Sequence, residues 1–200
     1  IRLHVRECHK EFEQNVILPF CREYKAGRTP TPPELVSQFK LIRELLPQLG
    51  IRQYSLQGYE ADDLLGTLSL QGEGMGVKPL LLTGDRDALQ LVDGVTELMF
   101  TRKGITDTVR FTPETVRETY GFGPEQVIDW KGMAGDSSDN IPGIPGVGDK
   151  TAVRLLQKYG TLENTLAHAA EEKGKLGEKL QNYADQARSC KELARIHRDA

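Results

Sequence analysis

Cysteine, methionine and tryptophan are scarce in this chain of 200 residues, which contains three, three and one of them. The three cysteines, Cys8, Cys21 and Cys190, are odd in number, far apart and outside any metal-binding spacing. Their placement argues against a disulfide scaffold and against a zinc site. Because such usage is typical of a reducing compartment, we expect a cytoplasmic protein.

Long hydrophobic runs are also missing. No apolar stretch approaches the roughly 20 residues that a transmembrane helix requires, and the start of the chain lacks the charged and apolar regions of a signal peptide. Hydrophobic residues make up 38% and charged residues 28% of the chain, as in ordinary soluble domains. We therefore expect one domain, or a domain with a substantial subdomain, with no membrane contact.

A strong positive charge is absent as well, since the formal net charge is -3. This total does not exclude nucleic acid as a partner, because the distribution of charge matters more than the sum. Seven of the acids fall in three short segments, and the rest of the chain is net basic. A phosphate-binding surface therefore remains compatible with the composition.

The first part of the chain alternates strands and helices, which indicates an α/β fold. We predict, in chain order, a helix over 33–49, a short strand within 51–57, a helix beginning at about 60, a buried strand at 79–83, a helix after 86 and a hairpin over 96–112 that turns at Lys103–Gly104. Gly72, Gly74 and Gly76 predict a loop after the second helix.

From Pro113 onward the patterns are helical only. We predict helices at 113–120, 124–134, 149–159, 161–170 and 174–195. The Gly- and Pro-rich segment GDSSDNIPGIPGVGDK (135–150) separates the second of these helices from the third. We place the boundary near residue 112, with one region over 1–112 and the other over 113–200.

Three carboxylates lie together in GYEADDLL (58–65), namely Glu60, Asp62 and Asp63, and no Lys or Arg lies within six residues of them. One interpretation is a helix N-terminus, where acids interact favourably with the helix dipole. The other is half of a metal site, in which a divalent cation offsets the repulsion between the acids. The choice depends on whether further acids converge on the same place.

Two further acidic turns are candidates for that convergence. Asp85 and Asp87 follow the predicted strand at 79–83, although Asp87 could simply cap a helix. Asp136 and Asp139 lie in GDSSDN, which could equally be an Asx-rich turn. Because ligands bind at the carboxyl ends of strands in α/β sheets, we expect the turn at Glu60, after the strand within 51–57, and the turn at Asp85, after the strand at 79–83, to open on the same edge of one sheet.

Oxygen ligands without a His or Cys cluster favour Mg²⁺ or Mn²⁺ over zinc. Seven carboxylates are too many for one such ion and fit a centre of two ions about 3.5–4 Å apart that holds a phosphodiester. The sequence shows no Ser-His-Asp or Cys-His arrangement that would compete with this interpretation.

The segment GIPGVGDKTAVRLLQKYG (143–160) predicts a glycine-rich turn that leads into a helix. Its bare backbone and the amides at the start of the helix can bind phosphate, and nearby basic side chains add charge. A tight interhelical turn is the alternative, since glycine readily adopts positive φ. The candidate DNA-binding residues here are Gly143, Gly146, Val147, Gly148, Lys150, Thr151 and Arg154.

Five motifs together resemble the 5′-nuclease domain of bacterial DNA polymerase I, a family that includes the flap endonucleases. They are YKAGRTPTPPEL, GYEADDLL, LLTGDRDALQLV, GDSSDNIPGIPGVGDKTA and YGTLENTL, in unbroken order from about Tyr24 to the C-terminus. The resemblance implies a PIN-like α/β nuclease core over 1–112 with a basic arch at about 22–40. It also implies an all-helical DNA-binding region over 113–200 with a helix-three-turn-helix near 136–159.

The family's activity supplies the functional expectations. The resemblance implies structure-specific 5′→3′ cleavage of nicked, flapped or forked duplex DNA in replication and repair, with two Mg²⁺ or Mn²⁺ ions as cofactors. We expect a monomer, and a polymerase domain is a candidate neighbour in the natural chain.

Residue by residue, the resemblance assigns roles to the charged positions. Glu60 and Asp62 match ligands of the first metal, with Asp63 beside them, and Asp85, Asp87 and Asp136 match ligands of the second, with Asp139 accompanying. Lys25 and Arg28 match catalytic residues of the arch, which binds the 5′ strand and steers the scissile phosphate. The Gly146–Lys150 turn matches the segment that holds duplex DNA, in the family often with a K⁺ ion.

The chain departs from the family at its start. Family members begin with about seventy residues that supply two strands and two further metal ligands, whereas here no Asp occurs before Asp62 and the residues before Cys21 do not match. We expect the sheet core to be incomplete. Two hypotheses follow: a metal-dependent 5′-nuclease, and a duplex DNA-binding fragment without cleavage. A purely structural role for all three acidic segments ranks last.

Overall fold

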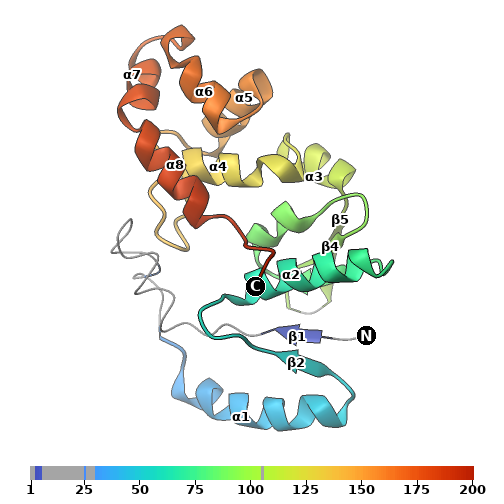
Figure 1. Cartoon of the computed structure of the whole chain (residues 1–200). Helices are drawn as coiled ribbons and strands as arrows, with labels where there is room; N and C mark the ends of the chain where they lie inside the picture. Colours follow the sequence, from blue (N-terminus) through green and yellow to red (C-terminus); the bar gives the residue numbers. More distant parts are fainter. Residues whose placement is uncertain (1–2, 6–24, 26–29, 105) are drawn as a thin grey trace.

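The computed structural model describes residues 3–5, 25, 30–104 and 106–200. Within them, β1 (Leu3–Val5) pairs in parallel with β2 (Arg52–Tyr54). Figure 1 shows these two strands between α1 (Pro33–Gln48) and α2 (Ala61–Gly74). This part of the molecule carries the first acidic turn, which lies between β2 and α2.

The helix predicted after the Pro-rich segment is confirmed, because α1 begins at Pro33, where proline suits the first helical turn. Most of its apolar side chains keep large exposed fractions, from 37% for Phe39 to 64% for Leu41, Leu46 is half-buried, and no residue of the helix is buried. The hydrophobic spacing therefore specifies the helix, while the core of the molecule lies elsewhere.

The main sheet consists of β3 (Leu80–Thr83), β4 (Glu97–Lys103) and β5 (Asp107–Phe111). β3 pairs in parallel with β4, and β4 pairs antiparallel with β5, which confirms the predicted hairpin and its turn at Gly104. Within the described residues β2 belongs to a different sheet from β3. Among the described residues, the acidic turns after β2 and β3 therefore do not open on the edge of a single sheet, contrary to the expectation from the sequence.

The second half of the chain is helical, as predicted. Its elements are α3 (Pro113–Tyr120), η3 (Pro124–Gln126), α4 (Val127–Ala134), α5 (Asp149–Tyr159), α6 (Leu162–Ala167), η4 (Ala169–Glu171), α7 (Lys175–Asn182) and α8 (Ala184–Leu193). α4 and α5 pack against each other across the intervening turns, and α8 packs on α4. The order of an α/β core and a helical region confirms the predicted fold class.

Two local predictions are wrong, and one needs refinement. The helix α2 continues through Gly72 and Gly74, because Glu73 between them is anchored by Thr96 and Arg198 and holds the last turn. The helix predicted after residue 86 is present as a short 3-10 helix, η2 (Arg86–Leu91). The helix predicted over 174–195 is broken at Tyr183, where φ is -112° and ψ is 19°.

One hydrophobic cluster joins the two halves. It includes Leu89 of η2, Leu98 of β4, Phe111 of β5 and, from the helical region, Met133 and Leu156, all less than 2% exposed. The sheet and the helical region therefore share one core and hold a fixed relation to each other. Among the described residues, no helix combines the length and apolar character needed to cross a membrane.

Candidate functional site

The second acidic turn begins where β3 ends. The backbone amide of Asp85 donates to Thr83 Oγ1 at 3.1 Å, and the Asp85 carboxylate accepts from the amide of Asp87 at 2.9 Å. Asp85, rather than Asp87, is thus the cap of the short helix that follows. This arrangement leaves the Asp87 carboxylate to turn toward α4.

The third acidic turn is closed by its own backbone. Asp136 and Ile141 exchange two backbone hydrogen bonds of 2.8 and 2.7 Å, and one Asp136 carboxylate oxygen accepts from the amide and hydroxyl of Ser138 at 2.8 and 2.6 Å. The Asx-turn interpretation is therefore correct for this half of the carboxylate. The other oxygen faces Lys131, so the turn also presents charge to a neighbour.

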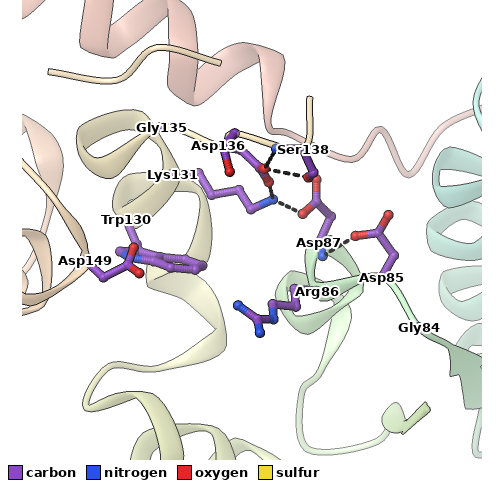
Figure 2. Close-up of a pocket in the computed structure, with 11 residues that line it drawn as sticks. Gly84, Asp85, Arg86, Asp87, Trp130, Lys131, Gly135, Asp136, Ser138 and Asp149 are labelled. Atoms are coloured by element: carbon purple, nitrogen blue, oxygen red, sulfur yellow. Dashed lines mark hydrogen bonds and ion pairs between the residues drawn. The ribbon is translucent and has the colours of Figure 1, made fainter. Parts of the chain in front are cut away.

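These two acidic turns meet at Lys131, whose ammonium group contacts the carboxylates of both Asp87 and Asp136 (Figure 2). Lys131 lies on α4 and is only 2% exposed. A pocket that also includes Asp85 and Asp149 surrounds the three side chains. Folding therefore brings Asp85, Asp87 and Asp136 together at one pocket. Their assignment as ligands of the second metal stays a prediction.

Lys131 and Asp149 are pocket residues that the sequence interpretation missed. Lys131 is a cation within the otherwise largely apolar helix VIDWKGMA, five residues before Asp136. A buried lysine requires an acidic partner, so its position on the buried face of this helix was the available signal. Asp149 is the first residue of α5.

Lys131 affects the pKa values of its two acidic partners, Asp87 and Asp136, to different extents. Burial raises the pKa of Asp87, as does repulsion from Asp85 and Asp136, while Lys131 opposes both, and the result is about 6. Burial acts against the charge of Lys131, but attraction to Asp87 and Asp136 prevails and raises its pKa. Burial disfavours the charged form of Asp136, yet hydrogen bonds from Lys131 and Ser138 outweigh it and lower the pKa. The pocket retains uncompensated negative charge, which favours a further cation.

The first acidic turn lies outside the lining of this pocket. Glu60 precedes the first residue of α2, and its carboxylate contacts Lys25 Nζ at 2.5 Å. The amide of Lys25 in turn donates to the backbone carbonyl of Asp139 at 2.9 Å. Lys25, which is 8% exposed, thus connects the first acidic turn to the third.

Asp62 and Asp63 differ in their surroundings. Asp62 is partly exposed in the first turn of α2. Asp63 is 5% exposed, and both of its carboxylate oxygens accept backbone amides, from Glu60 at 3.0 Å and from His197 at 2.8 Å. The helix-start interpretation therefore describes Asp63. Arg28, the second predicted arch residue, lies outside the described residues.

The donor chemistry of the pocket suits a hard cation, since the acidic turns offer carboxylate and hydroxyl oxygens. Within the described ranges, however, no three Asp, Glu, His or Cys side chains form a group that could hold a metal ion. The ammonium group of Lys131 lies between two of the carboxylates instead. An ion shared by Asp87 and Asp136 would have to displace it.

The glycine-rich turn before α5 contains both packed and open positions. Gly143 is buried at φ 60°, where an added Cβ would collide with the backbone of Gly135, and Val147 is in the core with its amide bonded to Ile144 O at 2.9 Å. Gly146 and Gly148 are exposed. Phosphate contact at this turn is thus available at Gly146 and Gly148 rather than at its buried glycine.

A second basic residue reaches this turn from a distant helix. The Lys179 ammonium group on α7 lies directly over Gly146, in the space that a side chain at that position would fill. Lys150 and Thr151 lie in the first turn of α5, beside the same glycines. The sequence interpretation missed Lys179 because 33 residues separate it from Gly146.

Arg154, one turn further along α5, is held by an acid. Its guanidinium bonds Glu172 at 2.9 Å, and Lys158 and the Tyr159 hydroxyl contact the same carboxylate, both at 2.8 Å. Hydrogen bonds from Lys158 and Arg154 hold the pKa of Glu172 down to about 2. Glu172 therefore positions two cations and neutralises part of their charge.

Two family models match the chain. The model described as the 5′-3′ exonuclease N-terminal resolvase-like domain matches residues 14–121, and that of the 5′-3′ exonuclease C-terminal SAM fold matches residues 122–200. The match begins about ten residues before Tyr24, so the interpretation that the residues before Cys21 do not match the family is wrong for residues 14–20.

Curated relatives agree with these models. The chain is 52% identical over 180 residues to DNA polymerase I of Bacillus caldotenax, and the alignment covers 90% of this chain and 20% of that protein. It is 46% identical over 178 residues to DNA polymerase I of Mycobacterium bovis, covering 88% of this chain and 20% of that protein. The chain thus spans about a fifth of the length of these relatives.

Solved structures share the fold. A structure of T5 5′-exonuclease with bound divalent metal ions (zinc) superposes with a TM-score of 0.73 and 22% identity, covering 88% of this chain and 68% of that one. A complex of the bacteriophage T5 D15 flap endonuclease with DNA and metal ions gives a TM-score of 0.73 at 20% identity, covering 96% and 71%. These two likenesses show that the chain shares its fold with both solved structures.

Proposed function

Because the chain belongs to the 5′-3′ exonuclease family, we propose that it is the nuclease region of a longer DNA polymerase I. In this proposal it hydrolyses DNA phosphodiesters at 5′ ends, nicks or flaps with the help of two Mg²⁺ or Mn²⁺ ions, in the cytoplasm. The observation that carries the proposal is the convergence of Asp85, Asp87 and Asp136 on one pocket from turns about 50 residues apart.

The acids divide into two groups in this mechanism. Asp85, Asp87 and Asp136 would hold one ion in place of the Lys131 ammonium group, and Glu60 and Asp62 would contribute to the other. Asp139 would accompany the second group, because its backbone carbonyl accepts the amide of Lys25, whose ammonium group contacts Glu60. When bound, a pair of ions supplies an activated water and stabilises the leaving oxygen. A K⁺ ion at the glycine-rich turn would have to share the space over Gly146 with the Lys179 ammonium group.

The helical region would hold the DNA backbone. Gly146, Gly148, Lys150 and Thr151 offer backbone amides and charge at the start of α5, where the helix dipole favours an anion. Lys179 adds a cation to the same turn. Contacts of this kind fix the register of duplex DNA without reading its sequence.

A second function is favoured by one observation, the position of Lys131 between Asp87 and Asp136. If divalent ions do not displace the Lys131 ammonium group from Asp87 and Asp136, the chain binds duplex DNA and does not cleave it. The two functions differ in a single measurable property, namely release of the 5′ strand.

A 5′-labelled flap oligonucleotide with millimolar Mg²⁺ or Mn²⁺ separates the two. The nuclease releases labelled fragments, whereas the binding fragment shifts the substrate in a gel and leaves it intact at every metal concentration. Asp85→Asn is the test variant, because the Asn side-chain oxygen can still accept the Asp87 amide. We expect it to lose at least about 100-fold in cleavage rate, given the several kcal/mol of charge stabilisation that a metal supplies.

Asp107→Asn provides the matched control, since Asp107 is exposed at the start of β5. It should retain both cleavage and DNA affinity. Cleavage that survives in Asp85→Asn would contradict the proposed role of the pocket, and absence of cleavage in the unmodified chain would leave the DNA-binding function.

A further inference from the structure

The carboxylate of Asp63 joins two parts of the chain that are distant in sequence. One oxygen accepts the amide of Glu60 at 3.0 Å, closing the first turn of α2, and the other accepts the amide of His197 at 2.8 Å, 134 residues later. The side chain is 5% exposed. Because each oxygen bonds an amide and water is excluded, Asp63 acts as a link between backbones.

His197 belongs to the C-terminal segment, residues 194–200, which runs back from α8 along α2 (Figure 1). Two hydrogen bonds from the side chain of Gln90 hold its start, since Nε2 donates to Ala194 O and Oε1 accepts the Ile196 amide, both at 2.9 Å. Its end is held by the Ala200 amide, which donates to Thr67 Oγ1 at 3.0 Å. The segment is therefore bonded at both ends.

Arg198 fixes the middle of the segment to the far end of α2. Its guanidinium lies 3.3 Å from Glu73 Oε1 and 3.5 Å from Ser69 Oγ, and its Nε donates to Gly66 O at 3.4 Å. These contacts lie one to three helical turns beyond the acidic turn. Arg198 can therefore be changed without touching Glu60, Asp62 or Asp63.

Gly66 shows that the segment and the helix are fitted to each other. A Cβ at this position would lie 3.0 Å from Ile196 Cγ2, 3.1 Å from Arg198 Cγ and 3.2 Å from Leu91 Cδ2. These separations are tighter than ordinary contacts, so the C-terminal segment approaches α2 as closely as it does because residue 66 is glycine.

We propose that Asp63 is a positioning residue and that the C-terminal segment sets the orientation of the first acidic turn. Asp63 and the segment fix the start of α2, and with it the backbone of Glu60 and Asp62, relative to the end of the helical DNA-binding region. The inference rests on the proposed function in one respect, since Glu60 and Asp62 are the ions' ligands only if the chain binds metal. The link between the segment and the turn stands on its hydrogen bonds.

The test compares Asp63→Asn with Arg198→Ala and uses Arg188→Ala as the control. Arg188 also lies in the helical region and pairs with acids, Glu163 and Asp185, but it does not touch α2. Amide hydrogen exchange over residues 58–66, measured by mass spectrometry on the full chain, reports the turn directly. Calorimetric titration with Mn²⁺ measures the affinity and the number of bound ions, which depend on how the ligands are arranged. A loss of folding stability alone does not change these quantities.

We expect exchange over residues 58–66 to accelerate about tenfold in both Asp63→Asn and Arg198→Ala, as the loss of one hydrogen bond to a charged group implies. Arg188→Ala should leave it unchanged. Mn²⁺ affinity should fall several-fold in both test variants with the number of bound ions unchanged. The result from Arg198→Ala carries the test if Asp63→Asn does not fold.

Two outcomes overturn the proposal. Unchanged exchange over residues 58–66 in Arg198→Ala would show that the segment does not position the turn. Loss of one bound ion in Asp63→Asn, with Mn²⁺ affinity unchanged in Arg198→Ala, would make Asp63 a ligand instead. If the unmodified chain binds no Mn²⁺, the metal part of the proposed function fails, and the exchange result still decides the positioning role.

Discussion

The ammonium group of Lys131 contacts the carboxylate of Asp87, which lies 44 residues earlier in the chain. This contact joins α4 of the helical region to the turn after β3, at the place where the candidate metal ligands converge. A buried lysine and a divalent ion are alternative cations for the same carboxylates. The balance between them decides whether the pocket is a metal site.

Replacing Lys131 with methionine tests that balance. Because the change leaves the half-buried carboxylates of Asp87 and Asp136 without their cation, we expect the metal-free protein to lose about 3 kcal/mol of unfolding free energy. Millimolar Mg²⁺ should then raise the melting temperature more in Lys131→Met than in the unmodified chain, since no ammonium group competes with the ion. Thermal denaturation with and without Mg²⁺ measures both effects.

Lys191→Met is the control for this variant. Lys191 also pairs with a buried acid, Asp129, at 2.6 Å, but that pair does not line the pocket. Lys191→Met should lower the melting temperature without changing the rise in melting temperature that Mg²⁺ causes. An equal Mg²⁺ response in both variants would show that Lys131 does not compete with metal.

Lys179 and Arg154 should contribute unequally to DNA binding. Lys179 lies over Gly146 and forms no ion pair among the described residues, whereas Arg154 is paired with Glu172. We expect Lys179→Ala to weaken duplex binding and to reduce the slope of log affinity against log salt concentration by about 0.9. Arg154→Ala should have a smaller effect, because its charge is already partly neutralised.

Fluorescence anisotropy with a labelled duplex at several KCl concentrations measures these slopes. Lys103→Ala is the control, since Lys103 is exposed at the end of β4, away from α5. If Lys179→Ala and Lys103→Ala give the same slope, the turn at Gly146 is not part of the DNA-binding surface.

Much of this architecture could be predicted from local signals. Pro33 and Pro113 start helices where proline suits the first turn, and Gly121 ends one at φ 79°. The hairpin of β4 and β5 follows from its alternating pattern and Gly104. Such signals act within a few residues, so the sequence alone reveals them.

The interactions that the sequence did not predict act over long distances. Lys131 is a pocket residue because α4 packs against η2, and Asp63 bonds His197 because the C-terminal segment returns to α2. The roles of the acids in GYEADDLL could not be separated for the same reason. Only the folded chain distinguishes buried Asp63 from partly exposed Asp62.

Acid should weaken the helical region through Glu172. Hydrogen bonds from Lys158 and Arg154 lower its pKa from 4.5 to about 2 in the folded state. Since the folded pKa is depressed, the stabilisation is fully present above about pH 4.5 and is lost as the pH falls from there toward 2. In Glu172→Gln, the loss of unfolding free energy between pH 5 and pH 2.5 should therefore be smaller than in the unmodified chain.

At neutral pH Glu172→Gln should cost about 1 kcal/mol, a value kept small because Lys158 and Arg154 are about half exposed. Urea denaturation at pH 7, 5 and 2.5 measures the difference. Glu163→Gln is the control, because Glu163 pairs with Arg188 on an exposed surface and is itself 53% exposed. Equal pH dependence in the two variants would contradict the assignment to Glu172.

Substitution by alanine should have very different effects on stability at two glycines of the same turn. At Gly143, φ is 60° and a Cβ would collide with the backbone of Gly135, Ala134 and Met133. Because backbone atoms cannot move aside as side chains can, we expect Gly143→Ala to destabilise the protein by about 3 kcal/mol or more. At Gly148, φ is -96° and no atom lies within 4 Å of the added carbon, so Gly148→Ala should change stability by less than about 0.5 kcal/mol.

The variants Gly143→Ala and Gly148→Ala also distinguish an effect on packing from an effect on DNA binding. Gly148 is exposed before the first turn of α5, where a methyl group would stand between the helix amides and a phosphate. Gly148→Ala should therefore weaken duplex binding several-fold while its melting temperature stays unchanged. Anisotropy and thermal denaturation on one preparation measure both, and unchanged duplex affinity in Gly148→Ala would mean that phosphate does not approach the backbone at this turn.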